Sequence, residues 1–213
     1  MSGYTYTTLK QALQDYTDNQ EATFVANLDN FIRAAEERIL NGAPLQVFRK
    51  NAYASLSDGQ KYMPKPSDWL FNYSCSIKPT KEAGDHSFLL NKDVSFIQEY
   101  WPDPDETEEP KYYADFDIDN FILAPTPDGD YYIELHYFYR PTSIVDAVDG
   151  VTWLGTNAGP ALLYGSLVEA YTFMKGEVDM IQSYEQNFQR ALSRITAFST
   201  RAEGLDFYRR PNA

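Results

Sequence analysis

Side chains that carry nucleophilic or metal chemistry are scarce in this sequence, which has one cysteine and two histidines among 213 residues. The single cysteine, Cys75, cannot close a disulfide within the chain, and such usage is typical of a reducing compartment. Neither His86 nor His136 has another histidine or a cysteine at metal-ligand spacing. Glycine-rich phosphate loops, G-x-S-x-G and CxxC are missing as well. The sequence therefore predicts no catalytic site, no metal and no cofactor.

Long apolar runs and basic patches are also missing. No stretch approaches the roughly 20 apolar residues that span a bilayer, and Met1–Thr8 lacks the basic-then-apolar layout of a signal peptide. We therefore expect a protein that is made in the cytoplasm and is not exported by the usual route. The formal net charge is −13, and Glu99–Glu134 holds 12 acids against one base, Lys111. A chain this acidic repels phosphates, which disfavours nucleic-acid recognition.

Apolar residues recur at helical spacing in four segments near the two ends of the chain. Asn27 is the predicted N-cap of the second helix, and Gly42 followed by Pro44 ends it. The third helix is apolar on two sides, so we expect it to be mostly buried. The predicted helices are about Thr8–Thr17, about Leu28–Asn41, from after Pro160 to about Lys175, and about Glu177–Thr200.

The middle of the chain, about Leu45 to Pro141, has short β-favouring runs separated by turn signals. Its clearest strand is Tyr131–Tyr139, whose alternation places its odd-numbered residues on one face and its even-numbered residues on the other. Asp93–Glu99 is a candidate short helix within this region. The pattern predicts an antiparallel domain of about five or six strands.

Together these patterns predict an α+β fold. The N- and C-terminal helices form a helical bundle, an antiparallel β domain is inserted between them, and an extended C-terminal arm follows. The expected parts are N-terminal helices at 1–44, the β domain at 45–141, C-terminal helices at 142–201 and the arm at 202–213.

The last helix and the arm carry apolar side chains that could contact other proteins. The helix has a long apolar stripe, part of which is expected to be core and part of which is a candidate subunit interface, at Tyr184, Phe188, Leu192 and Ile195. The arm combines aromatic and arginine side chains, the mixture enriched in binding hot spots. Its candidate docking residues are Leu205, Phe207, Tyr208, Arg209 and Arg210.

Acidic groups are the remaining candidates for chemistry. Asp115, Asp117 and Asp119 have the spacing that opens a calcium loop, but Asn120 and Thr126 stand where an EF-hand needs glycine and glutamate. A strand with its acids in solvent that turns at Asp119-Asn120 explains this spacing, and a weak cation site stays open as the alternative. Neighbouring acids such as Glu108 and Glu109 do not face each other across a cleft, as a glycosidase requires.

Several strings resemble the portal-to-tail adaptor proteins, also called head-to-tail connectors, of short-tailed phages. Their order and spacing along the chain, from about Tyr4 to Phe198, carry the resemblance more than any one string does. The strings are NFIRAAEERI (30–39), LLNKDVSFIQEYWP (89–102), PKYYA (110–114), LAPTPDGDYYIELHYFY (123–139), WLG (153–155) and LLYGSLVEAYTFMKGE (162–177).

The resemblance implies a virion structural protein and not an enzyme. It implies a dodecameric ring under the portal protein, with a tail nozzle or tube protein on its far side and a C-terminal arm that reaches the portal. DNA would pass through the ring without specific binding, so an acidic lumen would help it slide. The candidate lumen residues are Asp103, Asp105, Glu106, Glu108 and Glu109. Two other readings stay open: a ligand- or carbohydrate-binding tail module that uses tyrosine-lined strands, and a hydrolase that uses acid pairs.

Overall fold

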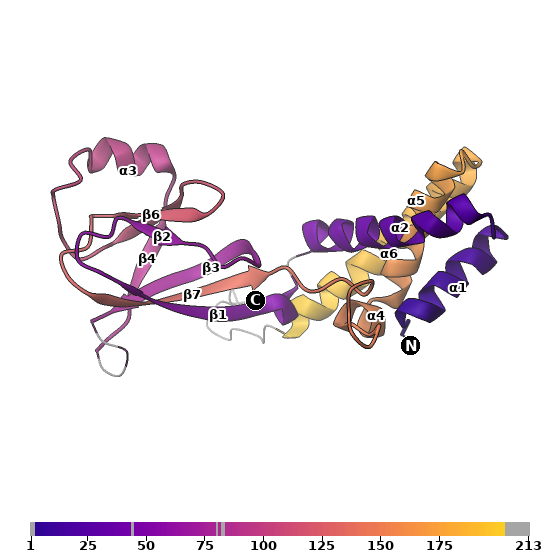
Figure 1. Cartoon of the computed structure of the whole chain (residues 1–213), viewed down its shortest axis with the longest axis horizontal. Helices are drawn as coiled ribbons and strands as arrows, with labels where there is room; N and C mark the ends of the chain where they lie inside the picture. The colour runs from indigo at the N-terminus through magenta and orange to yellow at the C-terminus, as the bar shows by residue number, and fades with distance from the viewer. Residues whose placement is uncertain (1–2, 44, 80, 82–83, 203–213) are drawn as a thin grey trace, which may run out of the picture. The chain divides into compact units, whose positions relative to one another are not determined.

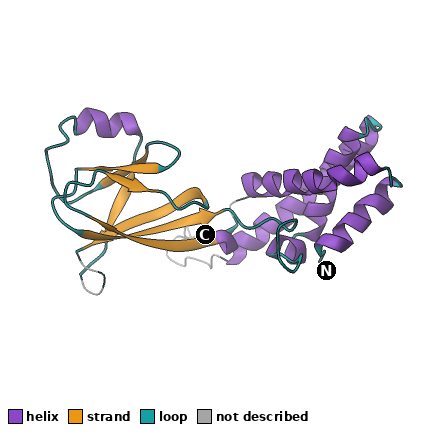
Figure 2. Cartoon of the chain, in the orientation of Figure 1, coloured by secondary structure: helices purple, strands orange, loops and turns teal. Residues whose placement is uncertain are grey.

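The computed structural model describes residues 3–43, 45–79, 81 and 84–202 (Figure 1). The chain divides into two compact units. A helical unit joins Met1–Val47 to Pro141–Ala213, and a β unit consists of Phe48–Arg140. The fold is therefore mixed α+β, as predicted, with helices and strands concentrated in different units (Figure 2).

The helical unit is organised around one buried helix, α5 (Gly159–Phe173). It contacts all four other helices of this unit. Most residues of α5 are buried, among them its alanines, leucines, glycines and a serine, as the two-sided apolar pattern predicts. The other four helices are α1 (Tyr6–Thr17), α2 (Ala22–Gly42), α4 (Trp153–Asn157) and α6 (Val178–Ala202).

The prediction that Asn27 caps the second helix is wrong. Helix α2 begins at Ala22, and Asn27 lies inside it, where its side-chain amide donates to the Thr23 carbonyl over 2.8 Å. The earlier start buries Phe24 one turn before Leu28, which extends the apolar stripe towards the N-terminus. Packing of that extra turn outweighs the local preference of asparagine for a cap.

Helix α4 was not predicted from the sequence. Thr152 caps it, because its side-chain oxygen accepts the Gly155 N–H over 3.1 Å. A Cβ on Gly155 would lie 2.5 Å from the Tyr4 carbonyl oxygen, so only glycine lets the N-terminal segment approach here. The Tyr4 N–H then donates to the Gly155 carbonyl over 2.8 Å.

None of the described helices combines the length and apolarity needed to cross a bilayer.

The β unit is one seven-stranded sheet in the order β1-β7-β3-β4-β5-β6-β2. The end strands β1 and β2 are joined by only the short segment 57–61, so the sheet curls until it is nearly closed. The strands are β1 (Arg49–Leu56), β2 (Tyr62–Pro64), β3 (Trp69–Lys78), β4 (Ser87–Asn91), β5 (Tyr112–Asp115), β6 (Asn120–Ala124) and β7 (Tyr131–Tyr139).

The sheet is not purely antiparallel, and it has more strands than predicted. Strands β4 and β5 pair in parallel, with Leu90 opposite Tyr112. A parallel pair needs a crossover connection, and here the chain crosses over through helix α3 (Val94–Tyr100) and the acidic loop that follows it. Asp93 caps α3 by accepting the Phe96 N–H over 2.8 Å, so the predicted short helix is confirmed. A turn pattern alone does not distinguish this crossover from a hairpin.

Side chains from all seven strands meet on the inner side of the curled sheet. Strand β7 shows the predicted alternation, because Ile133, Leu135 and Tyr137 are buried there. On the outer side, α3 packs on β5 and β6 through Ile97 and Ala114. The inner core is Leu56, Met63, Cys75, Ile77, Leu89, Tyr113, Phe121, Leu123, Ile133, Leu135 and Tyr137.

A buried carboxylate fastens the chain to α2 where it re-enters the helical unit. Glu36 is 6% exposed and accepts the Ile144 N–H over 2.9 Å. Burial raises the pKa of Glu36, and the Ile144 N–H only partly offsets this. One turn away, Arg33 forms a bidentate pair with Asp146 at 2.6 and 2.7 Å.

We expect the stability of the Glu36→Gln variant to increase relative to that of the wild type as pH rises. A carboxyl whose folded-state pKa is raised stabilises the fold at pH values below its ordinary pKa. This stability is lost as pH rises through the folded-state pKa. The difference in Tm between the glutamine variant and the wild type should therefore increase from about pH 4 to about pH 7. Thermal unfolding at several pH values measures it, with Glu21→Gln at the exposed start of α2 as the surface control. A difference that stays constant over this range would contradict the assignment.

We expect Gly165→Ala to destabilise the helical unit. A Cβ there would lie 3.0 Å from the Ala35 Cβ of α2 and 3.1 Å from the Phe188 ring of α6. Overpacking costs about 1–3 kcal/mol, which exceeds the gain of at most about 1 kcal/mol for alanine over glycine in a helix. Denaturant unfolding measures the loss. Gly129→Ala is the control, because a Cβ there would meet no atom of the described residues within 4 Å apart from those of its two chain neighbours. An equal response of the two variants would refute the close packing.

Candidate functional site

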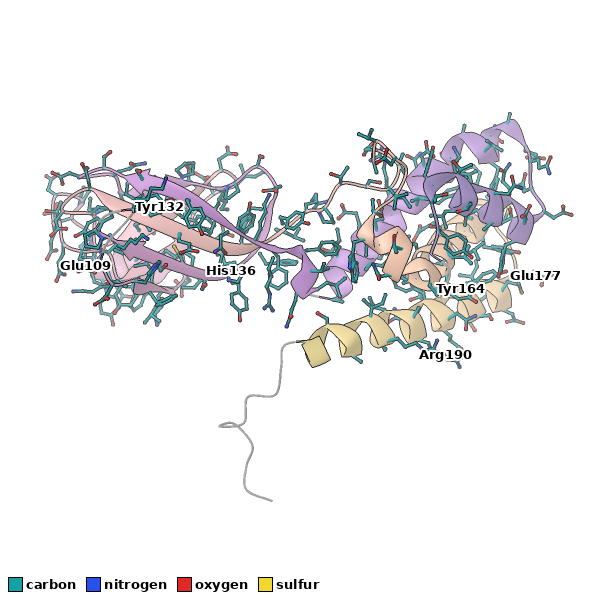
Figure 3. All side chains as sticks on the ribbon, turned by 90° about the horizontal axis from the view of Figure 1, so that it is seen from below. Glu109, Tyr132, His136, Tyr164, Glu177 and Arg190 are labelled. Carbon is teal, nitrogen blue, oxygen red and sulfur yellow. The ribbon has the colours of Figure 1, made fainter. Side chains whose placement is uncertain are left out.

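The acidic loop after α3 is fully exposed. Its acids Asp103, Asp105, Glu106, Glu108 and Glu109 all lie in solvent, and Figure 3 labels Glu109 on the β unit. Backbone hydrogen bonds tie the end of the loop to the sheet: the Glu108 N–H donates to the Thr126 carbonyl and the Lys111 N–H to the Ala124 carbonyl, each over 2.9 Å. The Lys111 ammonium also pairs with the Glu108 carboxylate at 2.6 Å. The other four acids have no ion pair among the described residues. The loop therefore presents a concentrated negative charge from a fixed position.

The three aspartates with calcium-loop spacing form a turn. Asp115 ends β5, and the Asp117 carboxylate accepts the Asp119 N–H at 2.8 Å and the Asn120 N–H at 2.7 Å. These hydrogen bonds lower the pKa of Asp117, and the one from the Asp119 N–H has the largest effect. The Lys65 ammonium contacts both the Asp115 carboxylate and the Asp117 carbonyl. The strand-and-turn interpretation is confirmed only in part. Asp115 is the one aspartate of the three on the strand, whereas Asp117 and Asp119 lie in the turn itself, and Asn120, predicted to lie in the turn, begins β6.

No metal-binding constellation forms among the residues that the structure describes, since no three His, Cys, Asp or Glu side chains gather there. The Cys75 thiol is buried, and burial raises its pKa to about 12. A thiol with so high a pKa is inert as a nucleophile near neutral pH.

The apolar stripe of α6 faces its own helical unit. Phe188 is 2% exposed and lies under the Arg38 guanidinium, 4.4 Å from the ring centre. Tyr184 packs on the Tyr171 ring at 5.1 Å, and its burial raises its pKa to about 12. Leu192 and Ile195 are each 9% exposed. A subunit contact through these four residues stays a prediction, and it would have to use the small part of each that remains at the surface.

The opposite side of α6 is polar. Arg190 stands on its outer side, away from the other helices (Figure 3). The candidate docking residues Leu205, Phe207, Tyr208, Arg209 and Arg210 lie outside the described part of the chain.

An aromatic surface on the outer side of the sheet was not predicted as a site. It covers β1, β7, β3 and β4, and the even-numbered side chains of β7 belong to it, as the alternation predicts. Tyr53 stacks on Tyr132 at 5.7 Å, and Tyr73 meets the His136 ring at 4.8 Å. We call Tyr53, Phe71, Tyr73, Phe88 and Tyr132 the aromatic face.

Members of the aromatic face are well exposed: Tyr53 is 57% exposed, Tyr73 54% and Phe88 69%. Two cations lie on them, with the Arg49 guanidinium 4.1 Å from the Tyr73 ring centre and the Lys78 ammonium 5.4 Å from that of Tyr132. Large exposed aromatic groups together with arginine are typical of binding surfaces. The sequence shows each tyrosine, but only the strand order shows that they are neighbours.

A polar cluster centred on Glu134 interrupts the aromatic face. The Glu134 carboxylate accepts hydrogen bonds from the Asn51 amide and, over 3.1 Å, from the Tyr53 hydroxyl. His86 Nδ1 lies 3.8 Å from Glu134 and 3.0 Å from Ser76 Oγ. A catalytic triad uses the two ring nitrogens for different partners, whereas Ser76 and Glu134 approach the same nitrogen. The cluster is therefore arranged for hydrogen bonding and does not form a serine nucleophile relay.

Comparison with known proteins assigns the chain to a family. No curated protein matches the chain. The model of the family described as SU10 adaptor protein matches residues 4–212, nearly the whole chain. This match confirms the resemblance to phage portal-to-tail adaptors that the sequence strings carry. The chain therefore belongs to the SU10 adaptor protein family and is a structural adaptor of a phage.

Proposed function

We propose that this chain forms the ring that joins the portal to the tail nozzle or tube and continues the DNA channel. The observation that carries the proposal is the family match over residues 4–212, which includes both units. An adaptor works by contact with its neighbours. The exposed aromatic face and the absence of a triad arrangement around Glu134 suit that role.

A ring built of identical chains closes by heterologous contacts, in which one surface of a subunit meets a different surface of the next. We infer that the ring is a dodecamer that matches the portal's symmetry. Each adaptor subunit can then make the same contact with a portal subunit. The residues after Ala202 form the arm that docks on the portal, through Leu205, Phe207, Tyr208, Arg209 and Arg210. Aromatic and arginine side chains at one short segment favour such a contact.

Charge supports the passage of DNA through the ring. Phe48–Arg140 holds 17 acids and 9 bases, so the β unit has a formal charge of −8. An acidic lumen repels the phosphates and prevents tight binding of the duplex. We place the exposed acids Asp103, Asp105, Glu106, Glu108 and Glu109 along this lumen.

A second candidate function is a carbohydrate-binding tail module. The observation that favours it is the polar cluster around Glu134 among exposed aromatic rings, since sugar sites combine a ring platform with hydrogen-bonding groups. An adaptor should join purified portal rings of the same phage, whereas a sugar-binding module should ignore the portal and respond to sugars. Native mass spectrometry with and without portal distinguishes the two functions.

We expect deletion of Leu205–Ala213 to weaken portal binding about tenfold or more, because the deletion removes a cluster of hot-spot residue types. Both units should remain folded, because the deletion leaves residues 3–202 unchanged. Native mass spectrometry of the complex measures binding, and thermal unfolding of the free chain is the control. Undiminished portal binding by a folded truncated chain would refute the docking arm.

We expect neutralisation of the acidic loop to slow DNA exit from assembled particles. The variant changes Asp103, Asp105, Glu106 and Glu109 to their amides and keeps Glu108, which pairs with Lys111. Without the repulsion, phosphates bind the wall more tightly, most clearly at low salt. Single-particle ejection kinetics measure the effect. Neutralised exposed acids of the helical unit, Glu21, Asp149, Glu177 and Asp179, are the control. A density map with every loop acid on the outside of the ring would rule out the lumen assignment.

A further inference from the structure

A second aromatic surface lies on the β unit, around α3. Phe96 contacts the Tyr100 ring at 4.6 Å and the Tyr112 ring at 5.5 Å, and Trp101 lies 5.2 Å from Tyr112. Tyr100 is 61% exposed. Tyr112 belongs to the outer side of β5, because its neighbour Tyr113 is part of the inner core. We call Phe96, Tyr100, Trp101 and Tyr112 the α3 cluster.

The α3 cluster and the aromatic face lie on different sides of the β unit. The strand order separates β1, β7 and β3 from β5 and β6, with β4 between them. Because the sheet curls around one interior, the outer sides of β7 and β3 face away from the outer sides of β5 and β6 across that interior. Figure 1 shows α3 over β6, with β1 and β7 on the far side of the unit.

The charges beside the two surfaces are opposite. Arg49 and Lys78 lie on rings of the aromatic face and outnumber the acid of its polar cluster, Glu134. The α3 cluster is bordered by exposed acids, Glu99 within α3 and Asp103 directly after it. Lys92, 5.0 Å from the Phe96 ring centre, is a cation on this side, and Glu99 and Asp103 outnumber it. Complementary charge orients one surface towards the other and disfavours contact between two copies of the same surface.

We propose that the aromatic face of one subunit binds the α3 cluster of a second copy of this chain, so that the β units form the contact that closes the ring. The inference rests on the proposed ring function and names its contact. One chain carries both halves of this contact on opposite sides, which is the geometry of a heterologous ring interface. Tyrosine, tryptophan and arginine, the types enriched in interface hot spots, supply the anchors. In this arrangement Asp103 lies at the border of the contact, and the acids from Asp105 to Glu109 are the ones left for the lumen.

The test mixes two single variants, Tyr73→Cys and Tyr100→Cys, on portal rings of the same phage and treats them with a short bis-maleimide reagent. Both positions are more than half exposed, so the substitutions leave the core intact, and the native Cys75 is buried. We expect cross-linked pairs that contain one chain of each variant only in the mixture. Val148→Cys, at a fully exposed position of the helical unit, replaces Tyr73→Cys in the control mixture and should give no pairs.

A charge exchange gives an independent readout. Lys78→Glu and Glu99→Lys should each weaken ring assembly about tenfold, and the double variant should restore it, because the exchange rebuilds the opposite charges. Rings that assemble without the mixed cross-link, or in which Tyr73→Cys links to itself, would overturn the proposed contact and leave the adaptor function intact. Failure of the wild-type chain to join the portal would instead overturn the ring function on which the inference rests.

Discussion

The antiparallel pairing of β1 with β7 is the constraint on which the arrangement of the chain depends. Eight successive residues of each strand pair, from Arg49 opposite Phe138 to Leu56 opposite Tyr131. These are the first and last strands of the β unit, so the chain enters and leaves that unit at neighbouring positions. Helices separated by about a hundred residues of sequence can therefore pack as one unit, with α2 from before the insertion against α5 and α6 from after it.

The same pairing divides the side chains of the β unit between its core and its outer surface. A strand points alternate side chains to opposite faces, and β7 uses Ile133, Leu135 and Tyr137 for the core. Its other residues are left for the outer surface, where Tyr132 and His136 join side chains of β1 and β3. The larger core of the curled sheet lies on its inner face, and α3 covers a smaller core on the outer side of β5 and β6. The outer face of the sheet carries α3 at one end of the strand order and exposed aromatic side chains at the other.

Sequence patterns predicted the elements whose signal is local. The alternation of Tyr131–Tyr139, the short helix predicted at Asp93–Glu99 and the two-sided apolar pattern of α5 depend on residues close in the chain, and each was confirmed. The parallel pairing of β4 with β5 and the burial of Glu36 depend on partners far away in sequence, so the patterns did not reveal them. Periodicity does predict an apolar stripe on α6, but it does not tell a core partner from a second subunit. The finer division of the helices and the C-terminal arm stay predictions.

The negative charge of the β unit opposes the assembly of any ring made from this chain. Neighbouring β units of charge −8 repel one another. At physiological salt the Debye length is about 8 Å, so this repulsion is weak between distant groups and strong only where surfaces approach. A contact that closes the ring must therefore supply apolar area and local cations at the point of approach. Arg49 and Lys78 lie on exposed aromatic rings of one such surface, where each can offset the acids of a neighbour without a basic patch that would bind DNA. The excess of acids over bases in the β unit is thus compatible with assembly, because a few cations at the contact suffice.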